Sequence, residues 1–223
     1  MPHMPVSCDL FCAVVDNLGD AGVCWRLARQ LAAEHGWHMR LWVDDTAPLA
    51  LLRPGIDPQL TQQTVDGVEI RRWTAPFPAV TPAQVVIEAF ACELPPAYIA
   101  AMAGQTQPPV WINLEYLSAE AWVAGCHGLA SPHPRLPLNK HFFFPGFTVG
   151  TGGLLRERSL AVPPAPTFQS RLTISLFCYD NPALPRLLDA WAAGKEPLEC
   201  RVADGLPRRQ VEAWLGAPFS ASA

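Results

Sequence analysis

The 223-residue sequence has few lysines and no cluster of basic residues. Only two lysines occur, Lys140 and Lys195, and the 16 lysines and arginines are outnumbered by 20 aspartates and glutamates, which gives a net charge of −4. Proteins that bind the phosphate backbone of nucleic acids usually present a clustered basic face. The composition therefore argues against a nucleic-acid partner and suits a cationic or neutral one.

Cysteine pairs with the spacing of metal or redox sites are also missing. The chain has seven cysteines, an odd number, and none of them forms a Cys-x-x-Cys pair. Several lie in apolar runs, where a free cysteine behaves as a small buried hydrophobic residue. The six histidines show no ligand spacing either. We therefore predict a reducing compartment, no disulfide framework and no metal site.

Long hydrophobic runs are absent from the sequence. No run approaches the roughly 18 apolar residues that a membrane-spanning helix needs. The first apolar stretch is flanked by Asp9 and Asp16 and is not preceded by a basic segment, unlike a secretory signal peptide. We expect a cytoplasmic protein without a membrane partner.

What the sequence does contain is an alternation of strand and helix patterns. Half of the residues are hydrophobic, and 24 prolines fall between the apolar runs, which favours short elements with sharp connections. Alternating strands and helices indicate a parallel α/β sheet. The first predicted strand ends at Val15, and four more span residues 39–43, 68–73, 85–90 and 110–114. The predicted helices span residues 23–35, 47–52 and 95–102, and a further short helix starts at Ser118.

The pattern changes in the second half of the chain. The alternation breaks over residues 126–153, of which 126–138 read as loop, and the proline-rich piece 162–167 reads as part of a linker. We predict a first domain at 1–153, a linker at 154–170 and a partial second domain at 171–223. The second domain has strands at 172–177 and 198–202 and helices at 182–191 and 207–215. Two strands bury little surface, so this domain leans on the first or lacks its completion.

The loop after the first strand carries two carboxylates, Asp16 and Asp20. In parallel sheets, ligands bind beyond the carboxyl ends of the strands and near helix N-termini. Such a pair could orient a cationic nucleophile or accept its proton. The alternatives are structural: an N-cap for Asp20 and an Asx turn for Asp16. Gly19 and Gly22 lack the first glycine of a dinucleotide-binding fingerprint.

Two further pairs of residues stand where strands end. Phe177 and Tyr179 flank a cysteine, and alternation places both rings on one face, where they could sandwich a flat base. The alternative is that both are core residues. Glu115 and Tyr116 follow the strand at 110–114, at an edge of the sheet where a site is expected, and no motif accompanies them.

Six sequence blocks occur in order along nearly the whole chain. They are Asp-Asn-Leu-Gly-Asp-Ala-Gly-Val-Cys-Trp-Arg-Leu-Ala-Arg-Gln-Leu at 16–31, Glu-Ala-Phe-Ala-Cys-Glu-Leu-Pro at 88–95, Trp-Ile-Asn-Leu-Glu-Tyr-Leu-Ser-Ala-Glu at 111–120, Phe-Phe-Phe-Pro-Gly-Phe at 142–147, Thr-Gly-Gly-Leu-Leu-Arg-Glu at 151–157 and Ser-Leu-Phe-Cys-Tyr-Asp-Asn-Pro at 175–182. With these blocks the chain resembles the bacterial protein-arginine rhamnosyltransferases that modify elongation factor P (EarP). The resemblance implies a GT-B architecture of two Rossmann-like domains, the first docking the protein acceptor, with Glu115 and Tyr116 as candidate contacts, and the second holding the nucleotide sugar.

The resemblance also implies a reaction and roles for residues. The enzyme would transfer rhamnose from dTDP-β-L-rhamnose to an arginine of elongation factor P, with inversion and without a metal. Asp20 would be the general base or the carboxylate that orients the guanidinium, and Asp16 would support it. The implied donor-site residues are Asn17, Leu18, Gly19, Phe177 and Tyr179.

Two departures from the family pattern shape the expectation. Leu18 stands where the family has phenylalanine, and an Arg-Gly-Glu-Asp-Ser element with a further catalytic glutamate has no counterpart here. We therefore expect a C-terminally truncated member that binds dTDP-rhamnose poorly and turns over little. The alternatives are a fragment that only docks elongation factor P, and a nicotinamide- or flavin-dependent Rossmann oxidoreductase.

Overall fold

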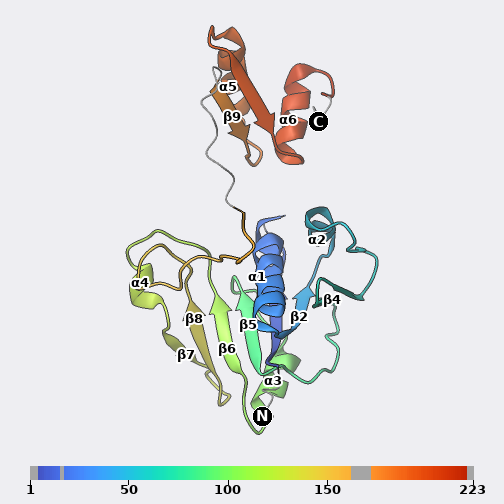
Figure 1. Ribbon diagram of the computed structural model, residues 1–223, viewed down its shortest axis with the longest axis vertical. Coiled ribbons are helices and arrows are strands. Elements are labelled where there is room, and N and C mark those ends of the chain that lie inside the picture. The colour runs from blue at the N-terminus through green and yellow to red at the C-terminus, as the bar shows by residue number, and fades with distance from the viewer. Residues whose placement is uncertain (1–4, 16–17, 162–171, 220–223) are drawn as a thin grey trace. The chain divides into compact units, whose positions relative to one another are not determined.

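The computed structural model describes residues 5–15, 18–161 and 172–219 (Figure 1). The chain divides into two compact units, residues 1–160 and residues 161–223. Each unit has its own sheet and its own hydrophobic cluster, so each is described by itself.

The first unit is built on an eight-stranded, mostly parallel sheet. Its strand order is β3-β4-β2-β1-β5-β6-β8-β7, and only the β3–β4 and β7–β8 pairs are antiparallel. From the central β1 the chain first builds towards β2 and β4, and then returns to β5 on the other side of β1. This reversal is a topological switch point, where parallel α/β sheets bind ligands. The strands are β1 (Ser7–Cys12), β2 (His38–Val43), β3 (Gln62–Val65), β4 (Val68–Arg72), β5 (Val85–Ala89), β6 (Val110–Leu114), β7 (Ala130–Pro132) and β8 (Asn139–Phe143).

Helices cover both faces of this sheet. On one face, α1 (Gly19–His35) and α2 (Ala47–Leu52) pack against strand residues such as Leu10 and Leu41. On the other face, α3 (Pro96–Ala103) packs with Phe11, Trp42 and Trp111. The short α4 (Val123–Cys126) lies between β6 and β7 in the chain. Alternation along β1 explains the two cores, because neighbouring side chains point to opposite faces.

The second unit is a small βαβα arrangement. It contains β9 (Leu172–Leu176), α5 (Leu184–Ala193), β10 (Leu198–Val202) and α6 (Leu206–Leu215), and its two strands pair in parallel. Its buried cluster among the described residues consists of Leu176, Leu184, Leu188 and Val211.

Most predicted elements of the chain are confirmed within a few residues. The elements at 47–52, 110–114 and 198–202 have the predicted bounds. The first strand ends at Cys12 rather than Val15, and α1 begins at Gly19 rather than Val23.

Three of the sequence predictions are wrong. The helix expected at Ser118 does not begin there: Ser118 forms an isolated bridge with Gly146, and its hydroxyl accepts a bond from the Glu120 amide. The 126–138 segment is not all loop, because β7 lies in it, and β8, which was not predicted, follows it directly. The polar edge strand β3 was also missed, although the Asp66-Gly67 turn that joins it to β4, with φ of 49° and 78°, is typical of a hairpin.

Candidate functional site

A cavity of about 740 Å³ lies in the first unit, on the α1 face of the sheet. It runs along β5 and β6 between α1 and the segment 152–156, and it reaches the carboxyl edge of the sheet at Asp20, Glu115 and Tyr116. Most of its lining is apolar, with Val23, Leu27, Ile87, Phe90, Ile112 and Leu114 among the contributing residues. Its polar lining residues are Asp20, Arg26, Gln30, Glu115, Tyr116 and Arg156.

Asp20 is the most deeply buried carboxylate of this cavity, with a residue exposure of 1%. One carboxylate oxygen accepts a hydrogen bond from the Val15 amide at 3.1 Å, and the other accepts one from the Tyr116 hydroxyl at 3.0 Å. The N-cap position of α1 is Leu18, whose side chain makes no capping bond. The interpretation of Asp20 as the N-cap is therefore wrong; it lies in the first turn, where the helix dipole favours a negative charge.

Tyr116 closes over Asp20 from the loop after β6. Its ring stacks on that of Phe90, with centroids 4.2 Å apart and planes 12° from parallel. Phe90 has a positive φ of 56°, and its amide donates to the Leu114 carbonyl at 2.7 Å. Tyr116 is about half exposed, and Phe90 is partly buried and packs against the core.

The turn that presents Phe90 is held by a buried ion pair. The Glu88 carboxylate accepts bonds from Trp111 Nε1 at 3.1 Å, Lys140 Nζ at 3.2 Å and the Glu93 amide at 3.2 Å. Positive φ values occur at Phe90, Ala91 and Glu93, a conformation that non-glycine residues rarely adopt. The ion pair lies on the α3 face of the sheet. The bond from the Glu93 amide to Glu88 restrains the end of the turn that is later in the chain.

Asn113 lies next to this ion pair on β6 and is fully buried. Its side-chain nitrogen donates to Glu115 Oε1 at 2.6 Å, which orients that carboxylate. Within the described ranges its side-chain oxygen accepts no hydrogen bond. The Glu115 amide in turn donates to the Phe143 carbonyl at 2.8 Å. Glu115 is therefore fixed at the cavity by both its backbone and its side chain.

Residues 152–158, which we call the strap, lie along α1 at the edge of the cavity. Arg26 donates two bonds of 2.7 Å to the Glu157 carboxylate, and Gln30 donates to the Arg156 carbonyl at 2.6 Å. The guanidinium of Arg26 lowers the pKa of Glu157 to about 2. At Gly152, a side-chain carbon would lie 2.3 Å from the Phe143 ring. Only glycine fits this close approach of the strap to β8.

The predicted site residues have different positions in the structure. Asp20, Gly19, Glu115 and Tyr116 line the same cavity. Asp16 and Asn17 lie outside the described residues, and Leu18 precedes α1 as its N-cap. Phe177 and Tyr179 follow β9 in the second unit.

Phe177 and Tyr179 are exposed aromatic residues. Their exposed fractions are 79% and 65%, so the interpretation of this pair as core is wrong. The backbone carbonyl of Tyr179 accepts a bond from the Gln210 side chain at 3.2 Å. Both side chains thus follow the carboxyl end of a parallel strand and are largely exposed.

Sequence reasoning missed Phe90, the Glu88–Lys140 pair and the strap. A glutamate inside the otherwise apolar strand 85–90 was the one available signal, because a buried charge needs a partner. No local pattern reports that Phe90 adopts a left-handed conformation or that Glu157 pairs with Arg26.

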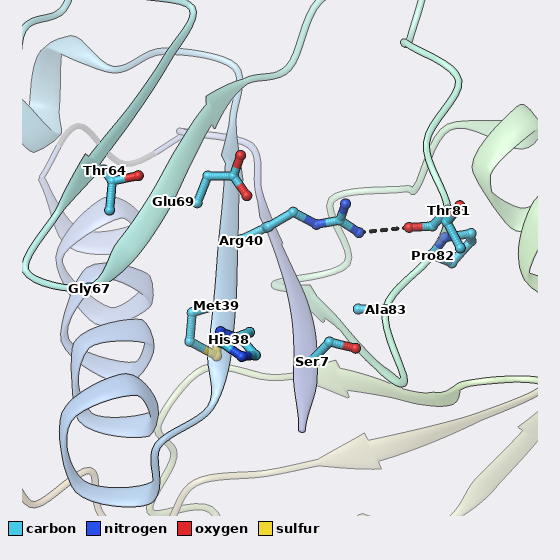
Figure 2. Close-up of a pocket in the computed structure, with 10 residues that line it drawn as sticks. All are labelled: Ser7, His38, Met39, Arg40, Thr64, Gly67, Glu69, Thr81, Pro82 and Ala83. Atoms are coloured by element: carbon cyan, nitrogen blue, oxygen red, sulfur yellow. Dashed lines mark hydrogen bonds between the residues drawn. The ribbon is translucent and has the colours of Figure 1, made fainter. Parts of the chain in front are cut away.

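A second hollow, of about 610 Å³, lies at the opposite edge of the sheet (Figure 2). It is lined by the amino-terminal ends of β1 and β2, including Ser7 and His38. Figure 2 shows Arg40 pointing across it to the Thr81 carbonyl, at 2.8 Å.

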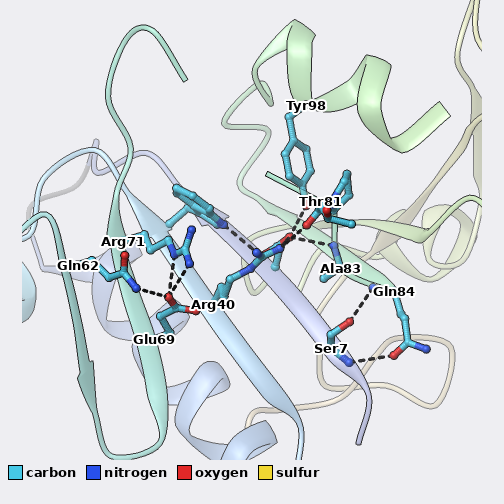
Figure 3. Close-up of polar contacts among 12 residues, drawn as sticks. Ser7, Arg40, Gln62, Glu69, Arg71, Thr81, Ala83, Gln84 and Tyr98 are labelled. Carbon is cyan, nitrogen blue, oxygen red and sulfur yellow. Dashed lines mark hydrogen bonds and ion pairs between the residues drawn. The ribbon is translucent and has the colours of Figure 1, made fainter. Parts of the chain in front are cut away.

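The charged groups beside this hollow are paired with one another (Figure 3). Arg40 holds the fully buried Asp9 through two bonds of 2.5 Å, and Asp9 also accepts bonds from Trp42 Nε1 and from the hydroxyl of Tyr98. Glu69 accepts bonds from neighbouring side chains in the same way. Because this network satisfies its own charges, we assign it to stability and take the Asp20 cavity as the candidate site.

Candidate metal ligands are dispersed over the described part of the chain. Nowhere in residues 5–15, 18–161 and 172–219 do three or more His, Cys, Asp or Glu side chains gather in a way that could hold a metal ion. The seven cysteines are all free thiols. Among the described helices, none combines the length and the apolar character that crossing a membrane requires.

Comparison with known proteins confirms the resemblance. Residues 8–223 match the family model described as "Elongation-Factor P (EF-P) rhamnosyltransferase EarP". The chain is 50% identical to a protein-arginine rhamnosyltransferase of Pseudomonas putida KT2440, over 96% of this chain and 61% of that protein. It is 47% identical to one of Pseudomonas aeruginosa PAO1, over 94% of this chain and 60% of that protein.

A solved structure gives a further comparison. It is described as "Structural basis for EarP-mediated arginine glycosylation of translation elongation factor EF-P", is 29% identical, and matches with a TM-score of 0.47 over 98% of this chain and 56% of that one. The chain thus spans about three-fifths of the length of the curated relatives named above. By its match over residues 8–223, the chain belongs to the EarP family of elongation factor P rhamnosyltransferases.

Proposed function

We propose that this chain transfers rhamnose from dTDP-β-L-rhamnose to an arginine side chain of elongation factor P, as an inverting enzyme of GT-B architecture. The observation that carries the proposal is the Asp20 carboxylate, fixed by two donors at the switch-point cavity of a chain in this family. Family membership argues against the alternative of a nicotinamide- or flavin-dependent oxidoreductase.

The proposed chemistry needs a carboxylate at this position. An arginine guanidinium is protonated in water and is a poor nucleophile. A carboxylate can hold it in line with the anomeric carbon and accept its proton as the carbon–nitrogen bond forms. We assign this role to Asp20 and a supporting role to Asp16.

The acceptor arginine would enter the cavity beside Glu115 and Tyr116. Glu115 adds a second carboxylate to the lining, and its position is fixed by the Asn113 amide. The half-exposed Tyr116 ring offers a flat face, on which a guanidinium packs favourably. The net charge of −4 also suits a cationic acceptor tip.

We divide the donor roles as the resemblance implies them. We assign the sugar end to Asn17, Leu18 and Gly19, which precede or begin α1. We assign the nucleotide to Phe177 and Tyr179, whose exposed rings could stack on the thymine base. The weak donor binding expected from the sequence stays a prediction, and tight binding of dTDP-rhamnose in calorimetry would contradict it.

Mass spectrometry of elongation factor P, incubated with this chain and dTDP-rhamnose, tests the proposal. We expect rhamnose on one arginine, and loss of transfer in Asp20→Asn with an unchanged circular dichroism spectrum. The matched control is Asp57→Asn, an exposed carboxylate outside the cavity lining, which should transfer normally. Full transfer by Asp20→Asn would refute the role of Asp20. Binding of elongation factor P by the unsubstituted chain without any transfer would favour the docking-only alternative.

A further inference from the structure

The Tyr116 hydroxyl forms a hydrogen bond with Asp20, and Tyr116 would not need this bond merely to contact the acceptor. The Tyr116 hydroxyl donates to one carboxylate oxygen at 3.0 Å while the Val15 amide donates to the other at 3.1 Å. The carboxylate torsion of aspartate is broad and does not by itself select one orientation. Two donors from different elements therefore define the plane of this carboxylate.

The Tyr116 ring is itself held in place by Phe90. A half-exposed tyrosine in a loop would otherwise sample several rotamers. Here its ring lies 4.2 Å from that of Phe90 and is nearly parallel to it. The opposite side of Phe90 packs against the core, so the ring beneath Tyr116 does not move away.

Phe90 adopts a conformation that is unfavourable for phenylalanine. Its φ of 56° lies in the left-handed region, as do those of Ala91 and Glu93. Strained residues of this kind persist only where the surroundings hold them, and they cluster at functional sites. The bonds from the Phe90 amide to the Leu114 carbonyl and from the Glu93 amide to Glu88 supply that restraint.

We propose that Tyr116 is a positioning residue for Asp20, and that the left-handed turn at Phe90 exists to hold it. This inference rests on the proposed function. In the transfer step, the guanidinium nitrogen bonds to the anomeric carbon, the bond from that carbon to the diphosphate oxygen breaks, and the nitrogen proton passes to the Asp20 carboxylate. Tyr116 keeps its proton throughout and acts only by holding the acceptor of that proton in line.

The Tyr116→Phe variant separates this role from simple acceptor contact. It keeps the ring, and with it both the stack on Phe90 and the flat face, but removes the hydroxyl. Because a hydrogen bond to a charged group is lost, we expect kcat to fall about tenfold or more, with KM for elongation factor P changed less than about twofold. The circular dichroism spectrum should stay unchanged, and the melting temperature should fall by no more than the loss of one hydrogen bond causes.

Two further variants complete the experiment. Phe90→Leu keeps an apolar side chain on the core but removes the flat partner, so it should also lower kcat, and its effect should not add fully to that of Tyr116→Phe. Ser118→Ala, which removes a hydroxyl from the same loop, should leave kcat unchanged.

The outcomes distinguish this inference from the proposed function. A normal kcat in Tyr116→Phe, whether or not KM is raised, overturns the positioning role. The proposed function still stands in that case, provided that the unsubstituted chain transfers rhamnose. No transfer by the unsubstituted chain overturns both. A lowered kcat with a KM changed less than about twofold and an unchanged circular dichroism spectrum, together with a non-additive double variant, supports the inference.

Discussion

Two nearly fully buried aspartates of the first unit differ in what surrounds them. Asp9 is enclosed by Arg40, Trp42 and Tyr98, on the α3 face of the sheet. Asp20 has an exposure of 1% but lies against a cavity. Burial alone therefore does not identify the functional carboxylate: Asp9 is neutralised by Arg40, whereas Asp20 accepts bonds from the Val15 amide and the Tyr116 hydroxyl beside a cavity.

Arg40→Met should destabilise the fold strongly, because it leaves the Asp9 charge buried without its partner. Removing one member of a buried pair typically costs about 3–5 kcal/mol. Arg53→Met is the control: its partner Asp66 is at the surface, and a pair of exposed charges contributes little to stability because water screens it. Urea denaturation measures both, and equal losses for the two variants would contradict the assignment.

The Cys92 thiol should react slowly in the folded protein although it is only partly buried. Burial, and then the negative charge of Glu88, raise its pKa to about 12. A raised thiol pKa keeps the group protonated at pH 8, and the protonated thiol is a poor nucleophile. Alkylation followed by peptide mass spectrometry should show slow labelling in buffer and fast labelling in urea. Fast labelling of Cys92 in the native protein would contradict this.

At the scale of elements, local pattern was enough for some parts of the fold and not for others. Residues 47–52, 110–114 and 198–202 were predicted with their observed bounds because their apolar periodicity is strong. Strand β8 was missed because its pairing with β6 depends on residues far away in the chain. The carboxyl-edge position of Asp20 followed from a general rule of parallel sheets, whereas the left-handed Phe90 depends on Leu114 and Glu88 and has no local signature.

Gly152→Ala should disturb the strap. The added carbon would lie 2.3 Å from the Phe143 ring and 3.0 Å from the His127 ring, so one of them must move. Overpacking of this kind costs about 1–3 kcal/mol. Gly125→Ala is the control, since no atom lies within 4 Å of the added carbon in α4. Thermal unfolding should separate the two variants, and equal melting temperatures would contradict the close packing.

The bond between the strap and α1 should weaken in acid. Arg26 lowers the pKa of Glu157 from 4.5 to about 2, so the pair stabilises the folded state above pH 4.5, and this contribution is lost as the pH falls towards 2. Hydrogen exchange of residues 154–158 should therefore increase relative to the rest of the unit between pH 5 and pH 2.5. Glu157→Gln should remove this pH dependence of hydrogen exchange. If the variant shows the same pH dependence, a group other than Glu157 causes it.

At the scale of the whole molecule, the two units differ in how much they bury. The first has an eight-stranded sheet with a hydrophobic cluster on each face, and the proposed acceptor site lies at its switch point. The second has two strands and a small cluster, and it carries the exposed pair Phe177 and Tyr179. We therefore expect the first unit to dominate binding of elongation factor P.

A hydrogen-exchange footprint of elongation factor P on this chain tests that claim most directly. We predict protection of residues 18–27, 85–93 and 112–118, which surround the Asp20 cavity, and weaker protection when the acceptor arginine of elongation factor P is replaced by alanine. Protection confined to residues around Arg40, or a footprint that is identical for the two forms of elongation factor P, would contradict the account.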